Sequence, residues 1–218
     1  MRTIFDSSEK VTVYHQQRYS GWVQRGISGR EHQVLGSLLD EMSRLERILD
    51  LPCGYGRFTE QLLPRTDCLL SFDLSQHMVL HVAQKMEELR SAVGGEAGQG
   101  FCAGASSVQL PLPDKSVDLS VAIRLFQHLH KAEQRVATLR EFGRVSRQRV
   151  IVTFYRSGTL HQAQRLIKKV KPGIKQITFR SFEQFGKEAG EAGLELERVI
   201  KLKRMVHSQT FAVLRPIG

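Results

Sequence analysis

The chain has 218 residues, 41% of them hydrophobic and 25% charged, which is the composition of a globular protein long enough to bury one α/β core. It has no apolar run near the roughly 20 residues of a membrane span and no secretory signal pattern at its start, so we expect a cytoplasmic protein. Its three cysteines, Cys53, Cys68 and Cys102, are too scattered for a disulfide framework or a zinc site and lie in or beside expected strands, so we expect buried free thiols. The net charge of +10 is uneven, because residues 1–139 hold 15 basic and 16 acidic groups whereas residues 140–218 hold 17 basic and 6 acidic groups.

The first part of the chain is polar and aromatic and leads into an expected helix. Ser28-Gly29-Arg30-Glu31 has the spacing of a capping box, which predicts a helix from there to about Leu45. We therefore treat residues 1–46 as an N-terminal helical segment ahead of the first strand.

The next segment predicts a strand, a glycine-rich turn and a helix. Residues 47–51 form a short apolar strand that breaks at Pro52, reaches Gly54 and Gly56, and opens a helix from Arg57 to about Leu63. Such a turn presents backbone N–H groups to a ligand, and glycine lets the ligand approach without a Cβ in the way. The turn is therefore expected to bind a ligand.

A second apolar run, residues 68–72, ends in Asp73. A carboxylate at the tip of the second strand of such a unit typically hydrogen-bonds a ribose diol. Asp73 could instead only cap the helix that we expect from Ser75 to about Ala92. Together the two segments predict a nucleoside-binding site.

The rest of the chain continues the alternation of strands and helices and then changes pattern. Expected strands at residues 101–103, 117–123 and 149–154, with a helix at 132–144, indicate a parallel sheet covered on both faces. Ser181-Phe182-Glu183-Gln184 is a second capping box, whose helix should stop at Gly193. Two apolar runs, 196–202 and 207–214, then predict an antiparallel hairpin.

The strand–turn–helix segment resembles a known family more closely than it resembles a dinucleotide fingerprint, whose third glycine is replaced here by Thr59. Asp50 to Gly56 is similar to motif I of the class I S-adenosylmethionine-dependent methyltransferases, with proline at the first glycine. Further matches follow in order along residues 47–155: Phe72-Asp73-Leu74-Ser75 with Met78, Leu110 to Asp118, Leu125 to Leu129, and Glu141 to Val145. The resemblance is nearest to small-molecule methyltransferases of the ubiquinone and menaquinone type.

This resemblance implies a Rossmann-like, seven-stranded, mostly parallel sheet with helices on both faces and an antiparallel C-terminal hairpin. It also implies S-adenosyl-L-methionine as the cofactor and one methyltransferase domain over 1–218, in which 1–46 is a lid, 47–155 the cofactor-binding core and 156–218 a basic substrate-side segment. The cofactor-binding residues that it implies are Tyr14, Tyr19, Asp50, Pro52, Gly54, Gly56, Arg57, Asp73, Leu74, Ser106 and Arg124.

The chain departs from the family where many members carry a carboxylate for the adenine amine. The stretch Gly104-Ala105-Ser106-Ser107 has none, so a hydroxyl or a backbone carbonyl would serve, and a protein that keeps the fold without catalysis stays open as a third hypothesis. His128 is the candidate catalytic residue, because a neutral imidazole can take the proton of an acceptor hydroxyl. The alternative is that His128 caps the following helix or packs at the sheet edge.

The acceptor is addressed by charge. Between Phe142 and Phe182 the chain has ten basic residues and no acidic one, which favours an anionic small molecule or glycolipid, methylated on oxygen or activated carbon, over a merely solvated face. An RNA acceptor, such as a tRNA, is the alternative partner, because cations also contact a nucleic-acid backbone. The sequence gives no oligomeric state.

Overall fold

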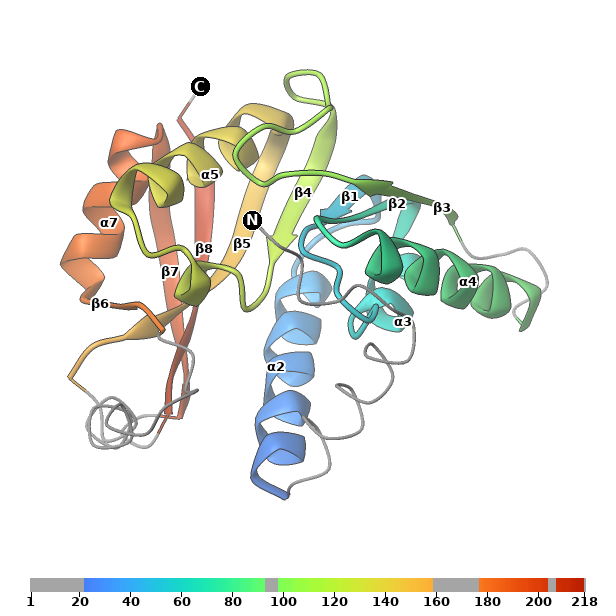
Figure 1. Ribbon diagram of the computed structural model, residues 1–218, viewed down its shortest axis with the longest axis horizontal. Helices are drawn as coiled ribbons and strands as arrows, with labels where there is room; N and C mark the ends of the chain where they lie inside the picture. Colours follow the sequence, from blue (N-terminus) through green and yellow to red (C-terminus); the bar gives the residue numbers. More distant parts are fainter. Residues whose placement is uncertain (1–21, 93–97, 159–176, 204–206, 218) are drawn as a thin grey trace. The chain divides into compact units, whose positions relative to one another are not determined.

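The computed structural model describes residues 22–92, 98–158, 177–203 and 207–217, and Figure 1 labels its helices and strands. The chain divides into two compact units, one of residues 1–106 and 117–119 and the other of residues 107–116 and 120–218. In hydrogen-bonding order the strands run β3-β2-β1-β4-β5-β8-β7, and a short strand, β6, pairs with β5. Among the helices so described, none is both long and apolar enough to cross a membrane.

The first unit contains α2 (Trp22–Asp40), β1 (Leu45–Asp50), α3 (Thr59–Leu62), η1 (Leu63–Arg65), β2 (Thr66–Asp73), α4 (Gln76–Ala92) and β3 (Gln99–Gly104). Strand β2 lies between β1 and β3 and is parallel to both. Ile48, Leu49 and Leu69 are fully buried, as expected for central parallel strands covered on both faces. The predicted strands and helices of this unit are therefore present, with ends shifted by a few residues.

Helix α2 corrects one prediction. The helix starts at Trp22 and ends at Asp40, so Ser28 and Glu31 lie inside it rather than at its N-terminus. Both side chains bond instead to Arg57, with Glu31 Oε2 at 2.6 Å and Ser28 Oγ at 2.9 Å from Arg57 Nη2. The capping-box spacing was misleading because a partner 26 residues away, which no local pattern reveals, takes these side chains.

The second unit contains the end of β4 (Val117–Ala122), η2 (Phe126–His128), α5 (Ala132–Val145), β5 (Ser146–Arg156), β6 (Phe179–Arg180), α7 (Phe182–Glu191), β7 (Leu194–Lys203) and β8 (His207–Pro216). Strand β8 lies between β5 and β7 and is antiparallel to both, which confirms the predicted C-terminal hairpin. The two-residue β6 raises the strand count to eight, against the seven predicted. Its shortness left no periodic pattern in the sequence.

Helices α5 and α7 pack against each other and against the sheet of this unit (Figure 1). The capping box at the start of α7 is confirmed, because Ser181 Oγ accepts from Gln184 N–H and the Gln184 side chain accepts from Ser181 N–H. Phe185 then stacks on Phe154 of β5 with ring centroids 4.2 Å apart. The cap thus sets where α7 begins, and the aromatic stack holds it against the sheet.

Two of the motifs that resemble the family, residues 110–118 and 141–145, are joined by hydrogen bonds and an ion pair. Arg144, near the end of α5, donates to the Leu110 and Leu112 carbonyls and pairs with Glu141 and Asp114. Glu141 in turn accepts from Leu110 N–H at 2.7 Å, and its pKa is lowered, first by the hydrogen bond from Arg144. The Leu-Pro-Leu-Pro-Asp segment and the Glu-Phe-Gly-Arg segment therefore serve structure, holding the loop before β4 against α5.

Candidate functional site

The turn after β1 is held by the tip of β2. Cys53 N–H donates to the Phe72 carbonyl at 2.9 Å, and Gly54 N–H donates to Asp73 Oδ2 at 3.0 Å. The Leu51–Pro52 peptide is cis, and Gly56 N–H closes a tight turn onto the Cys53 carbonyl at 2.9 Å. The hydrogen bonds from Cys53 and Gly54 tie the turn to the end of β2.

Both glycines of this turn are required by the backbone. Gly54 and Gly56 have φ of 52° and 63°, in the left-handed region that side-chain-bearing residues rarely adopt. A Cβ on Gly56 would lie 2.6 Å from Thr59 Oγ1, whereas a Cβ on Gly54 would meet nothing within 4 Å. Gly56 is therefore needed for close packing, and Gly54 faces the open space that a ligand could fill.

Asp73 caps α4, which is the alternative to ribose binding, and its carboxylate can still accept further hydrogen bonds from a ligand. Its Oδ1 accepts from Ser75 N–H at 2.8 Å, directly before α4, while Oδ2 accepts from Gly54 N–H. Burial raises the pKa of Asp73, and the backbone N–H donors oppose that rise. Because an ionised carboxylate accepts about four hydrogen bonds, these contacts leave room for a diol.

Asp50, the last residue of β1, is a buried carboxyl group with an unsatisfied oxygen. It is 1% exposed, and within the described part of the chain its Oδ2 has no hydrogen-bond partner. Burial raises the pKa of Asp50 to about 8, the charge of Asp73 adds to the rise, and Arg57 opposes it. An unsatisfied buried acceptor beside open glycine backbone fits a ligand that brings a cation and hydrogen-bond donors, as S-adenosylmethionine does.

Side chains from α2 and α4 also contact the turn, and the sequence did not indicate these contacts. The Arg57 guanidinium is held by Glu31 and Ser28 of α2. Lys85 of α4 donates to the Gly56 carbonyl at 3.0 Å and pairs with Glu60 at 2.9 Å. Lys85 lies 29 residues from Gly56, and no short-range pattern in the sequence could have indicated this contact.

Leu74 and Ser106 follow the tips of β2 and β3. Leu74 is 55% exposed, and Ala105 N–H donates to the Asp73 carbonyl at 3.0 Å, which brings the segment before Ser106 beside Asp73. Pro52 and Ser106 are half-buried. The predicted cofactor residues of the first unit therefore gather at the carboxyl ends of β1, β2 and β3.

Arg124 and His128 belong to the second unit. Arg124 has φ of 63°, and its N–H donates to Thr153 Oγ1 at 2.8 Å while its carbonyl accepts from Gln127 Nε2 at 2.6 Å. His128 is half-buried at the end of η2, and α5 has Lys131 at its N-cap, so His128 is not the cap of that helix. Tyr14 and Tyr19, the predicted lid residues, lie outside the described residues.

The thiols are free, as expected. Cys53 is buried, whereas Cys68 and Cys102 are only half-buried. Burial raises the pKa of each thiol, that of Cys102 to about 11. A neutral thiol is a poor nucleophile, which agrees with Cys53 being part of the loop rather than of the chemistry.

Comparison with known proteins agrees with this geometry. A family model described as "Methyltransferase domain" matches residues 48–149, which include β1, the glycine turn and the tip of β2. No curated protein matches the chain in sequence.

Solved structures share the fold at low identity. Magnesium protoporphyrin IX methyltransferase from Synechocystis, with S-adenosylhomocysteine bound, is 16% identical with a TM-score of 0.74, covering 96% of this chain and 97% of that one. The N-methyltransferase NodS from Bradyrhizobium japonicum is 14% identical with a TM-score of 0.66, covering 88% and 97%. A possible histamine N-methyltransferase from Thermotoga maritima is 17% identical with a TM-score of 0.65, covering 95% and 96%.

The sheet, the glycine turn and the two carboxyl groups belong to a Rossmann-like α/β fold. The match of residues 48–149 to the methyltransferase family model is consistent with a class I S-adenosylmethionine-dependent methyltransferase, and the structures that share the fold include one with S-adenosylhomocysteine and one with S-adenosylmethionine bound.

Proposed function

We propose that this enzyme transfers the methyl group of S-adenosylmethionine to an oxygen, or an activated carbon, of an anionic small molecule or glycolipid by in-line displacement. The unsatisfied carboxyl oxygen of Asp50 beside the open Gly54 backbone supports the cofactor part of the proposal. The excess of cations in residues 140–218 supports the acceptor part.

The cofactor supplies an activated methyl group, so the chain is left with binding and orientation. Positioning of this kind can supply roughly 7–11 kcal/mol of the barrier. We assign the backbone from Pro52 to Arg57 to the carboxylate end of the cofactor, Asp50 to its cationic end and Asp73 to its ribose. We assign Leu74 and Ser106 to the surroundings of the adenine base of the cofactor. Arg124, which follows β4, is the remaining proposed cofactor-binding residue.

Asp73→Ala is expected to weaken S-adenosylhomocysteine binding by about 1–3 kcal/mol, a factor of about 5 to 150, because charge-assisted hydrogen bonds are lost. Isothermal titration calorimetry measures this. Asp118→Asn is the matched control, because Asp118 is also a buried carboxylate that accepts a backbone N–H, from Arg47 at 3.0 Å. Its affinity should stay unchanged, and equal affinities of the wild-type and Asp73→Ala chains would reduce Asp73 to a helix cap.

In the described part of residues 142–182, several cations form ion pairs that the sequence did not indicate. Arg144 pairs with Glu141 and Asp114, Arg149 with Glu197, and Arg180 with Glu188. All four acids lie outside residues 142–182, and Asp114 and Glu197 are 30 and 48 residues from the cations that they meet, which is why the stretch looks uniformly basic. Four lysines of this stretch, Lys168, Lys169, Lys171 and Lys175, lie outside the described residues.

Replacing Lys168, Lys169, Lys171 and Lys175 together by Gln is expected to raise the KM of an anionic acceptor and to make it less sensitive to salt, with kcat preserved. The acceptor is first identified by incubating the enzyme and isotopically labelled S-adenosylmethionine with a metabolite extract, and analysing the labelled product by mass spectrometry. The affinity for S-adenosylhomocysteine is the internal control and should not change. An unaltered KM at low salt would show that these lysines form a solvated face.

His128 is proposed as the general base. His128 is the last residue of η2, the first element after β4, and is half-buried there, so its neutral imidazole could take the proton of an acceptor hydroxyl. An activated carbon acceptor would need the same proton transfer, which leaves the role of His128 common to both chemistries.

A further inference from the structure

Three cations lie at the carboxyl ends of neighbouring strands in the second unit. Arg156 is the last residue of β5, Arg180 is the last residue of β6, and Lys201 is near the end of β7. Strand β6 is parallel to β5, and β7 has the same direction because both β5 and β7 are antiparallel to β8. The three side chains therefore start from the same end of the sheet, where ligands of open α/β sheets bind.

The strand register places two of these cations side by side. Arg156 and Arg180 are register partners in the parallel β5–β6 pair, so their side chains leave the sheet on the same face. Like charges placed directly opposite each other on one face repel each other, and this repulsion favours an anion at this place. The face is the one covered by α7, because Arg156 contacts Phe182 and Arg180 contacts Glu188.

The first residue of α7 brings the third cation to the same place. Lys201 Nζ lies 5.3 Å from the centroid of the Phe182 ring, and the Arg156 guanidinium carbon lies 5.7 Å from it. Both are within the range of cation–π contacts. The N-terminal end of α7 adds the partial positive charge of its dipole, although the exposed Glu183 of the first turn offsets part of it.

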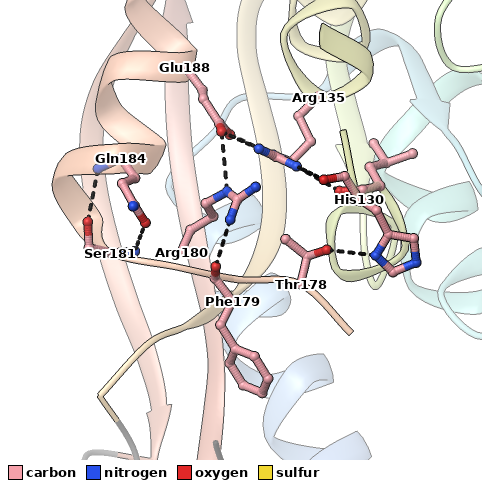
Figure 2. Close-up of polar contacts among 9 residues, drawn as sticks. His130, Arg135, Thr178, Phe179, Arg180, Ser181, Gln184 and Glu188 are labelled. Atoms are coloured by element: carbon pink, nitrogen blue, oxygen red, sulfur yellow. Dashed lines mark hydrogen bonds and ion pairs between the residues drawn. The ribbon is translucent and has the colours of Figure 1, made fainter. Parts of the chain in front are cut away.

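The buried acid nearby, Glu188, is already engaged (Figure 2). Arg135 donates to both of its carboxylate oxygens, from Nε at 2.8 Å and from Nη2 at 2.5 Å. Arg180 reaches Glu188 only through Nε at 3.3 Å and donates from Nη1 to the Phe179 carbonyl. Within the described chain Nη2 of Arg180 has no hydrogen-bond partner, so two guanidinium groups share one carboxylate and one positive charge is left over.

We infer that Arg156, Arg180 and Lys201 form a binding site for an oxyanion, a phosphate or a carboxylate, at the start of α7. The guanidinium of Arg180, through its Nη2, and the flexible ammonium group of Lys201 are donors of the kind that bind such anions. The inference rests on the proposed function in one respect, that the oxyanion is the anionic group of the methyl acceptor. The inference assigns recognition of that anionic group to these three side chains rather than to the basic stretch as a whole.

The site is tested by measuring the binding of inorganic phosphate and of acetate to the purified chain. Isothermal titration calorimetry or the shift of the thermal unfolding midpoint measures this binding. The wild type should bind phosphate saturably, and Arg180→Gln and Lys201→Gln should each weaken binding by about tenfold, the loss of one charge-assisted hydrogen bond. Lys201 is exposed, so its variant should fold even if Arg180→Gln does not.

Arg149→Gln is the matched control, because Arg149 is also on β5 but pairs with Glu197 at 3.0 Å. It should bind phosphate like the wild type. Absence of saturable binding to the wild type, or an equal loss in Arg149→Gln, would overturn the inference.

The affinity for S-adenosylhomocysteine separates this inference from the proposed function. The variants are expected to lose phosphate binding, to keep S-adenosylhomocysteine binding, and to show a raised KM for the acceptor with kcat preserved. A wild type that binds S-adenosylhomocysteine but no oxyanion would overturn the inference alone, and one that binds oxyanions but transfers no methyl group would overturn the proposed function alone. Once the acceptor is known, phosphate should compete with it, and non-competitive behaviour would contradict the assignment to the acceptor.

Discussion

Replacing Asp50 by Asn is expected to flatten a fall in stability that the wild-type chain should show as the pH rises from about 4 to about 8. The folded chain keeps a proton on Asp50 up to a pKa of about 8, because burial and Asp73 disfavour the charged form, whereas the unfolded chain has released it at the ordinary value of 3.8. Stability is therefore full below the unfolded pKa, and it decreases by up to about 1.4 kcal/mol per pH unit across this window.

Urea unfolding of both proteins at several pH values measures the difference. Near pH 4 the two free energies of unfolding should agree, and near pH 8 the Asn variant should be the more stable, because it cannot titrate. Parallel curves over the whole range would show that Asp50 is ionised in the folded chain.

The same variant should bind S-adenosylmethionine more weakly. In the wild type the positive charges of the cofactor should favour the ionised form of Asp50, so binding should release a proton near neutral pH. Calorimetry in buffers of different ionisation enthalpy detects that proton, and Asp50→Asn should abolish its release. Stability and cofactor binding are thus expected to change in opposite directions at this position, as is common for residues kept for function.

Glu188→Ala is expected to lower the free energy of unfolding by about 3–5 kcal/mol, because it leaves the charge of a buried arginine without its carboxylate. Arg135 is only 2% exposed, and it would keep just the carbonyls of Leu129 and His130 as acceptors (Figure 2). The loss should also loosen Arg180, which shares the same carboxylate. Urea unfolding at neutral pH measures the change.

Glu195→Ala is the matched control for Glu188→Ala. Glu195 pairs with Arg215 at 2.5 Å, a distance like that of the buried pair, but both side chains are more than half exposed. Water and side-chain entropy cancel most of the attraction at such a site, so the change should lie within the error of the measurement. Similar losses in the two variants would show that burial does not set the strength of the Glu188 pair.

The elements that the sequence predicted well are those whose signal is local. The strand, glycine turn and helix from Arg47 to Leu63 contain their own explanation, since the backbone at Gly54 and Gly56 requires positive φ. The capping box at Ser181 is also complete within four residues, and the structure confirms it. The hairpin of β7 and β8 follows from two apolar runs and a short connection.

Predictions failed where a distant partner decides the role of a residue. The pattern at Ser28 and Glu31 is that of a cap, yet both side chains bond to Arg57, and the helix begins six residues before Ser28. The stretch from Phe142 to Phe182 contains no acid, yet Arg144, Arg149 and Arg180 each meet a carboxylate from outside that stretch. Sequence distance hides such pairs because an ion pair depends on separation in space.

The sequence by itself indicated a methyltransferase-like α/β fold and S-adenosylmethionine as its cofactor, because the backbone of a nucleotide-binding turn can be built by few residues in few orders. Only the tertiary structure decided the state of the groups around that turn. It buried Asp50 without a partner for one oxygen, gave Asp73 two backbone donors, and set Lys85 against the Gly56 carbonyl. It also gathered Arg156, Arg180 and Lys201 at one end of the sheet, because charge and solvation depend on which side chains folding brings together.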